Sequence, residues 1–276
     1  MSALPNDSDS PTTSEASPAT TEQPVADATA ETAAPLRLRY RIRFAKDGLL
    51  RWTSHRDLAR LWERLLRRAQ LSLSMTEGFH PKPRISFPSA LALGVSGLRE
   101  VVELDLSEDI LAADLLEKLA SDQQPGLHLH SVQRIPQSAG KAKLKELQYS
   151  ISLPDAELYE GSVDLNNVQQ AIDALLQQDS VTIERKKKQQ TFTINEQITT
   201  LALSDQGIRL NLAASDGATL KPSDVLDLIG CADWVAGGSQ ITRTDVVLQR
   251  ELEPTDPELF AQTNPSSPDD GTIGEV

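Results

Sequence analysis

One stretch, LRLRYRIRF from Leu36 to Phe44, constrains the fold more than any other part of this 276-residue chain. Its apolar residues alternate strictly with four arginines, Arg37, Arg39, Arg41 and Arg43. Strict alternation is the period of a β-strand, in which successive side chains point to opposite faces of a sheet. The stretch therefore predicts a strand with one apolar face on a core and four guanidinium groups on the other face.

The elements that follow predict an α+β fold. Helical spacing of apolar residues predicts helices at 53–71 and 109–120, and short apolar or alternating runs predict strands at 85–87, 101–106 and 126–135. The order βαββαβ is that of a ferredoxin-like unit. The rest repeats it loosely, with strands at 147–153, 181–185, 190–194, 198–204, 207–213 and 241–249 and helices at 165–178 and 221–230. We expect two tandem ferredoxin-like units with antiparallel sheets.

Both ends of the chain predict disorder. Residues 1–35 hold six acidic and no basic residues, and residues 251–276 hold seven acidic and no basic residues. Such segments bury too little apolar surface to offset the entropy lost on ordering. The predicted organisation is a disordered acidic tail at 1–35, a first unit at 36–140, a second unit at 141–250 and a disordered acidic tail at 251–276.

Charge is divided unevenly between the two halves. Residues 36–145 hold 19 Lys and Arg against 12 Asp and Glu, a net charge of +7, whereas residues 146–250 hold 8 against 15, a net charge of −7. The net charge of −13 for the whole chain therefore describes the tails. The basic first half predicts an anionic partner.

The only cysteine is Cys231, which excludes a disulfide within the chain and an iron–sulfur cluster held by this chain alone. We expect no metal site: His128 and His130 share one strand face, but two nitrogens are too few without a third ligand. No apolar leader or membrane-length stretch is present, so the expected location is the cytoplasm.

Three basic segments are candidates for nucleic-acid binding. They are the strand with Arg37, Arg39, Arg41 and Arg43, the predicted helix with Arg56, Arg60, Arg64 and Arg67, and the loop GFHPKPR with Lys82 and Arg84. The strand arginines have an alternative: a ladder of charge pairs with Glu103 and Asp105 on the neighbouring strand. The helix stripe is alternatively a solvated basic face. The run ERKKKQQ, residues 184–190, predicts a hairpin tip or a further RNA contact.

His55 and His80 are the only candidates for catalysis. His55 lies at a predicted helix start, where the helix dipole disfavours its charged form, so it could act as a general base with His80 as the acid. Structural roles for both, or RNA binding without chemistry, are the alternatives. We therefore assign no catalytic residue.

The passage SHRDLARLWERLLRRAQLSLSMTEGFHPKPRISF resembles the radical-SAM-associated bacterial domain family, a group of unknown function. The motif residues are Ser54, His55, Asp57, Gly78, Phe79, His80, Pro81 and Pro83. The resemblance implies that the chain works beside a radical SAM protein, often near a ribonuclease of the E/G type. Thr193 to Glu196 depart from an Asp-Ile-Arg-Pro stretch of that family, so we place no site there.

Two tandem ferredoxin-like units also resemble, at the level of fold, the RAMP superfamily of CRISPR systems, whose members bind and in some cases cleave single-stranded RNA. Fold alone does not define function.

The sequence leaves three hypotheses. The first is an RNA-binding accessory protein, itself non-catalytic, that works with a radical SAM enzyme on tRNA or rRNA. Because a radical SAM site needs three cysteine thiolates, the iron–sulfur cluster and S-adenosylmethionine would belong to the partner, and this chain would hold no cofactor. The second is a metal-independent, RAMP-like endoribonuclease that uses His55 and His80. The third is a protein-interaction adaptor without nucleic acid.

Overall fold

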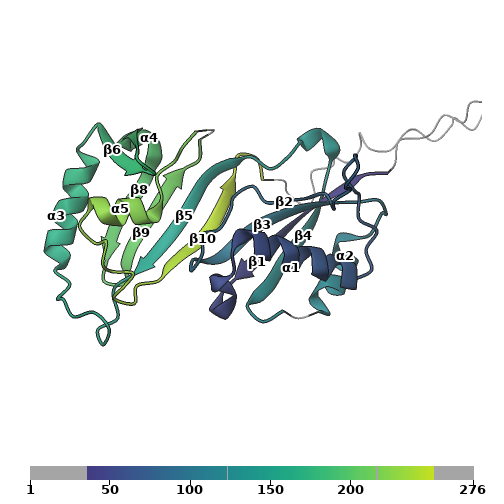
Figure 1. The fold of residues 1–276 in the computed structure, drawn as a ribbon, viewed down its shortest axis with the longest axis horizontal. Coiled ribbons are helices and arrows are strands. Elements are labelled where there is room, and N and C mark those ends of the chain that lie inside the picture. The colour runs from purple at the N-terminus through teal and green to yellow at the C-terminus, as the bar shows by residue number, and fades with distance from the viewer. Residues whose placement is uncertain (1–35, 123, 216, 252–276) are drawn as a thin grey trace, which may run out of the picture. The chain divides into compact units, whose positions relative to one another are not determined.

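The structure, a computed structural model, describes residues 36–122, 124–215 and 217–251 (Figure 1). The predicted tails, 1–35 and all of 251–276 except Glu251, lie outside the described residues, so their disorder stays a prediction. The described chain has a mixed α+β fold around a mostly antiparallel sheet.

The first half follows the predicted order of elements. In sequence it contains β1 (Leu38–Lys46), the 3-10 helix η1 (Gly48–Trp52), α1 (His55–Arg68), β2 (Ile85–Ser86), β3 (Ser96–Leu106), α2 (Ala112–Ala120), β4 (Leu127–Ile135) and the 3-10 helix η2 (Gln137–Ala139). β1 lies between β3 and β4 and is antiparallel to both.

The second half adds eight strands or helices that the sequence predicted and one short helix that it did not. They are β5 (Leu144–Ser152), α3 (Leu165–Leu176), β6 (Ser180–Arg185), β7 (Lys188–Thr193), α4 (Ile194–Gln197), β8 (Ile198–Ser204), β9 (Gly207–Ala213), α5 (Pro222–Leu228) and β10 (Ile241–Leu248). β6 and β7 form a hairpin apart from the main sheet, and their turn at Lys186 and Lys187 has positive φ at both residues. The predicted hairpin tip in the lysine run is thus confirmed.

One eight-stranded sheet joins the two halves, in the order β4-β1-β3-β10-β5-β9-β8 with β2 beside β3. Separate antiparallel sheets had been expected, but β10 pairs with β3 in parallel, Thr242 opposite Ser96 and Arg243 opposite Gly97. The physical reason is the length of β3, which begins five residues before the predicted strand. β2 covers only Glu103 and Leu104 of the outer edge of β3, so the backbone at the extended start of the strand needs another partner, and β10 pairs with its first two residues.

Helix α1 covers the apolar face of β1. Tyr40, Ile42 and Phe44 are fully buried and form one core with Leu58 and Trp62 of the helix and their buried neighbours. The rings of Phe44 and Trp62 meet edge to face with centroids 5.1 Å apart. Since side chains alternate along a strand, the arginines of β1 face the opposite, helix-free side of the sheet.

A second core fills the other half, where α3 and α5 contribute Ile172, Leu175 and Val225 against Ile151 and Leu210 of the sheet. The structure describes no helix long and apolar enough to cross a membrane.

Candidate nucleic-acid interface

The arginines of β1 form the charge ladder that the sequence offered as one alternative. Arg39 lies opposite Asp105 in the sheet register, and Arg41 lies opposite Glu103. The Nε of Arg39 is 3.0 Å from Asp105 Oδ1, and the Arg41 guanidinium donates two hydrogen bonds to Glu103 Oε1, at 2.9 and 3.1 Å. Arg41 is only 4% exposed and Glu103 2%. The Arg41 guanidinium is therefore occupied within the protein and is not presented to a ligand.

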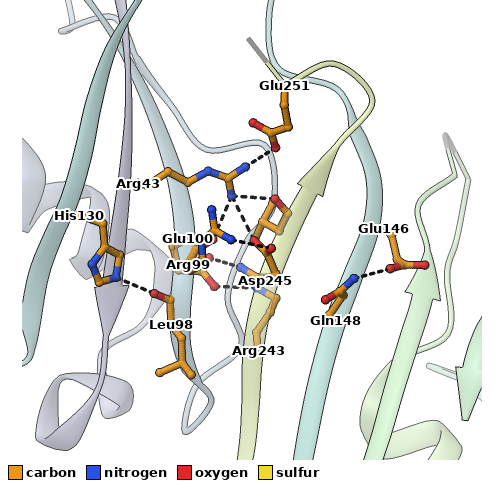
Figure 2. A network of polar contacts seen from close by, with 11 residues as sticks. Arg43, Leu98, Arg99, Glu100, His130, Glu146, Gln148, Arg243, Asp245 and Glu251 are labelled. Atoms are coloured by element: carbon orange, nitrogen blue, oxygen red, sulfur yellow. Dashed lines mark hydrogen bonds and ion pairs between the residues drawn. The ribbon is translucent and has the colours of Figure 1, made fainter. Parts of the chain in front are cut away.

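Arg43 is also occupied. Its guanidinium donates to the carbonyl of Val246 at 2.7 Å and pairs with Asp245 at 3.4 Å and with Glu251 (Figure 2). Arg99 pairs with the other oxygen of Asp245 at 3.2 Å. Of the four strand arginines that the sequence offered as candidates for nucleic-acid binding, Arg41 and Arg43 thus hold the sheet together.

A buried polar cluster joins the two halves on the helix-covered side. The Arg243 side chain, 1% exposed, donates to both carboxylate oxygens of Glu100, with Nε 2.8 Å from Oε1 (Figure 2). It also donates to Ser89 Oγ at 2.9 Å. Lys46 is fully buried nearby, with Nζ 2.9 Å from the carbonyl of Thr53, and burial lowers the pKa of its ammonium group. This cluster is a structural joint, because its three charged residues, Arg243, Glu100 and Lys46, are at most 3% exposed.

The remaining strand arginines border a basic pocket on the helix-free side of the sheet. The pocket has a volume of about 170 Å³. Its four basic residues outnumber its two carboxylates; together these six are Arg37, Arg39, Arg84, Lys141, Glu103 and Asp105. Arg37 and Arg39 share the single carboxylate of Asp105, at 2.6 and 3.0 Å, and the Arg37 side chain is 36% exposed. The pocket therefore keeps a surplus of positive charge that faces water.

A tight hairpin forms one wall of this pocket. Its two arms are tied at Ser74 and Arg84, whose backbone atoms bond at 2.9 Å, and at Thr76 and Lys82, which bond twice, at 2.8 and 2.9 Å. Arg84 donates through Nε to the carbonyl of Met75 at 2.9 Å. The loop GFHPKPR thus projects from a base that hydrogen bonds close and that lies on the pocket. Lys82 is exposed and forms no ion pair within the described residues.

The arginine stripe of α1 is exposed but lies on the other side of the sheet. Arg56, Arg60, Arg64 and Arg67 all face solvent. Arg60 pairs with Asp57 at 3.3 Å, and the neighbouring Arg68 pairs with Asp122 at 2.5 Å. Because α1 covers the apolar face of β1, the structure does not bring this stripe together with the pocket. One continuous basic surface made of strand, helix and loop is therefore not formed.

The two candidate catalytic histidines have separate surroundings. The His55 ring packs edge to face on Phe87 at 5.1 Å, and its Nδ1 is buried without a hydrogen-bond partner in the described structure. His80 is exposed at the tip of the hairpin. No contact joins the two imidazoles within the part of the chain that the structure describes. Catalysis by this pair stays a prediction that no contact supports.

The motif residues at the start of α1 cap the helix. Ser54 is the N-cap: its Oγ accepts from the backbone N–H of Asp57 at 3.2 Å and donates to the Asp57 carboxylate at 2.7 Å. The Ser54 hydroxyl, followed by Arg60, holds the pKa of that carboxyl below its usual value. Gly78, Phe79, Pro81 and Pro83 belong to the hairpin described above.

Lys141 is the pocket residue that the sequence prediction missed. It belongs to the alternating run Lys141, Lys143 and Lys145, which carries the only signal that could have indicated it. No sequence pattern indicated that a connection after β4 would reach the face of β1. His128 Nε2 lies 3.3 Å from Asp47 Oδ1, and His130 Nε2 bonds the carbonyl of Leu98 at 2.8 Å. The described residues contain no group of three or more potential metal ligands.

Comparison with known proteins gives one finding. No curated protein matches the chain. A family model does match, over residues 39–222, and this range includes β1 from Arg39 onward, the capped helix α1, the hairpin and most of the pocket. The match covers well over half of the chain, and it shows that the chain belongs to DUF2344, a family of uncharacterized proteins conserved in bacteria.

Proposed function

We propose that this protein binds RNA through the basic pocket and the hairpin beside it, as a non-catalytic partner of a radical SAM enzyme that acts on tRNA or rRNA. The observation that carries the RNA part is the pocket, in which four cations surround two carboxylates. Its volume of about 170 Å³ leaves room for a phosphate group with a few waters, since one water occupies about 30 Å³ of liquid. The planar guanidinium of an arginine can donate two parallel hydrogen bonds to the oxygens of one phosphate.

The partnership with a radical SAM enzyme rests on the resemblance of the motif and on the single cysteine. That cysteine is itself unsuited to metal chemistry, because it is buried in the second core and burial raises the pKa of its thiol to about 11. The cluster and cofactor would then come from the partner.

We also propose that each half is a ferredoxin-like unit. The support is the strand order, in which the first strand of each half lies between the third and the fourth: β1 between β3 and β4, and β5 between β9 and β10. The β6–β7 hairpin would then be an insertion in the second unit, and the pairing of β3 with β10 would join the sheets of the two units at their edges.

The test is salt-dependent RNA binding by charge-reversal variants. Lys82→Glu with Lys141→Glu changes two exposed lysines that form no ion pair within the described residues, so folding should be preserved. Each lost phosphate contact should reduce the slope of log K against log[salt] by about 0.7 for single strands. The matched control, Lys186→Glu with Lys187→Glu, reverses the same charge at the β6–β7 turn. Equal losses from both pairs would mean that the pocket is not the binding site.

A further inference from the structure

We infer that the RNA bound at the pocket is single-stranded and that Phe79 stacks on one of its bases. This inference rests on the proposed function and adds the class of RNA and the residue that selects it. The observation behind it is the position of Phe79, which is 102% exposed at the tip of the hairpin. Within the described residues its ring has no aromatic or cationic partner.

The hairpin holds this ring away from the protein. Below the tip, Thr76 and Lys82 close the arms through two hydrogen bonds. Within the tip, Gly78 allows the chain to turn through φ +115, a conformation that L side chains rarely adopt, and Pro81 fixes its own φ two residues after Phe79. The proline and the two closing hydrogen bonds restrict the loop, and a restricted loop loses less freedom when a ligand stacks on its ring.

The surroundings of the ring favour a nucleotide over an apolar protein surface. Lys82 is exposed three residues along the chain, and Thr76, Pro83 and Arg84 of the same hairpin border the basic pocket. The hairpin that carries Phe79 therefore also supplies part of the lining of the pocket. An apolar protein surface that bound here would remove water from these charged groups and offer them no partner, which is energetically costly.

Stacking on Phe79 favours single-stranded RNA, because the faces of the bases are not accessible in a duplex. In a helix the faces of the bases are stacked on each other, and only an unpaired nucleotide can offer a face to an aromatic side chain. Removing a stacking aromatic side chain typically weakens single-strand binding by about 5- to 150-fold.

The experiment compares Phe79→Ala, Phe79→Leu and Phe79→Trp for binding a labelled single-stranded oligoribonucleotide of about ten residues, within the usual site size, and the same sequence as a duplex. Because the side chain is wholly exposed, none of these changes should alter folding. The matched control is Leu49→Ala, which removes another exposed apolar side chain, 88% exposed, from the 3-10 helix η1 that follows β1.

We expect Ala and Leu to weaken single-strand binding by about 5- to 150-fold, Trp to retain it, and the duplex and Leu49→Ala affinities to stay unchanged. Full affinity in Phe79→Leu would overturn stacking in favour of simple apolar contact. Equal losses on single strand and duplex would overturn the selection of single strands. Either result leaves the proposed function standing, whereas failure of the unaltered protein to bind any RNA would overturn the proposed function itself.

Discussion

At the scale of single residues, four arginines that look alike in the sequence have different roles. Alternation predicted correctly that they share one face, and the carboxylates of Glu103 and Asp105 were predicted as their partners. The degree of burial could not be predicted, because it depends on which strands and connections cover each position. The Arg41 side chain is buried and its guanidinium bonds the backbone carbonyl of Arg250, whereas the side chain of Arg37, which precedes β1, stays partly exposed.

Arg41→Gln should therefore destabilise the fold. It leaves the buried carboxylate of Glu103 without its cation, and breaking a buried ion pair from one side costs about 3–5 kcal/mol. Denaturant unfolding should show this loss. Arg37→Gln is the control: its partner Asp105 keeps Arg39, so stability should change by less than about 1 kcal/mol. Similar losses from both variants would contradict the division between buried and open arginines.

Cys231 should be chemically silent in the folded protein. Because burial raises the pKa of its thiol to about 11, the reactive thiolate is scarce at pH 8, and the side chain is also only 2% exposed. We expect labelling by a maleimide to be slow until denaturant is added. Fast labelling of the native protein would show that the second core opens readily around Cys231.

At the scale of elements, periodicity predicted nearly all helices and strands, and the lysine run between two strand-like stretches predicted the β6–β7 hairpin. The sequence did not predict the joint between the halves. Predicting it would have required the information that β2 is only two residues long and that β3 extends back to Ser96, and both depend on tertiary pairing. Arg243 and Glu100, which lie 143 positions apart in the sequence, meet only because β10 pairs with β3.

Glu100→Gln should weaken this joint. The change leaves Arg243 and Lys46 as buried cations near an uncharged amide, and we expect a loss of about 3–5 kcal/mol in the free energy of unfolding. Replacing both members, Glu100→Met with Arg243→Met, should recover the part of this loss that comes from Arg243, since only Lys46 is then left as a buried cation without the carboxylate. A stable Glu100→Gln variant would show that the cluster does not hold the halves together.

At the scale of the whole molecule, the three buried clusters draw all their residues from between Tyr40 and Leu248. A chain cut to residues 36–251 keeps every one of them, together with the Glu251 carboxylate on Arg43. We expect its thermal midpoint to lie within about 4 °C of that of the full chain, as a change of 1 kcal/mol shifts the midpoint of a domain this size by about 2–4 °C. Loss of cooperative unfolding in the shortened chain would contradict this.

The central claim is that RNA lies over the basic pocket and the hairpin, and the most direct measurement is a lysine footprint. The full chain would be acetylated briefly with and without a single-stranded oligoribonucleotide, and each lysine read by mass spectrometry. We predict protection of Lys82 and Lys141, with Lys186, Lys187 and Lys188 at the β6–β7 hairpin labelled equally in both samples. Protection of those three lysines, with Lys82 and Lys141 unprotected, would contradict the account.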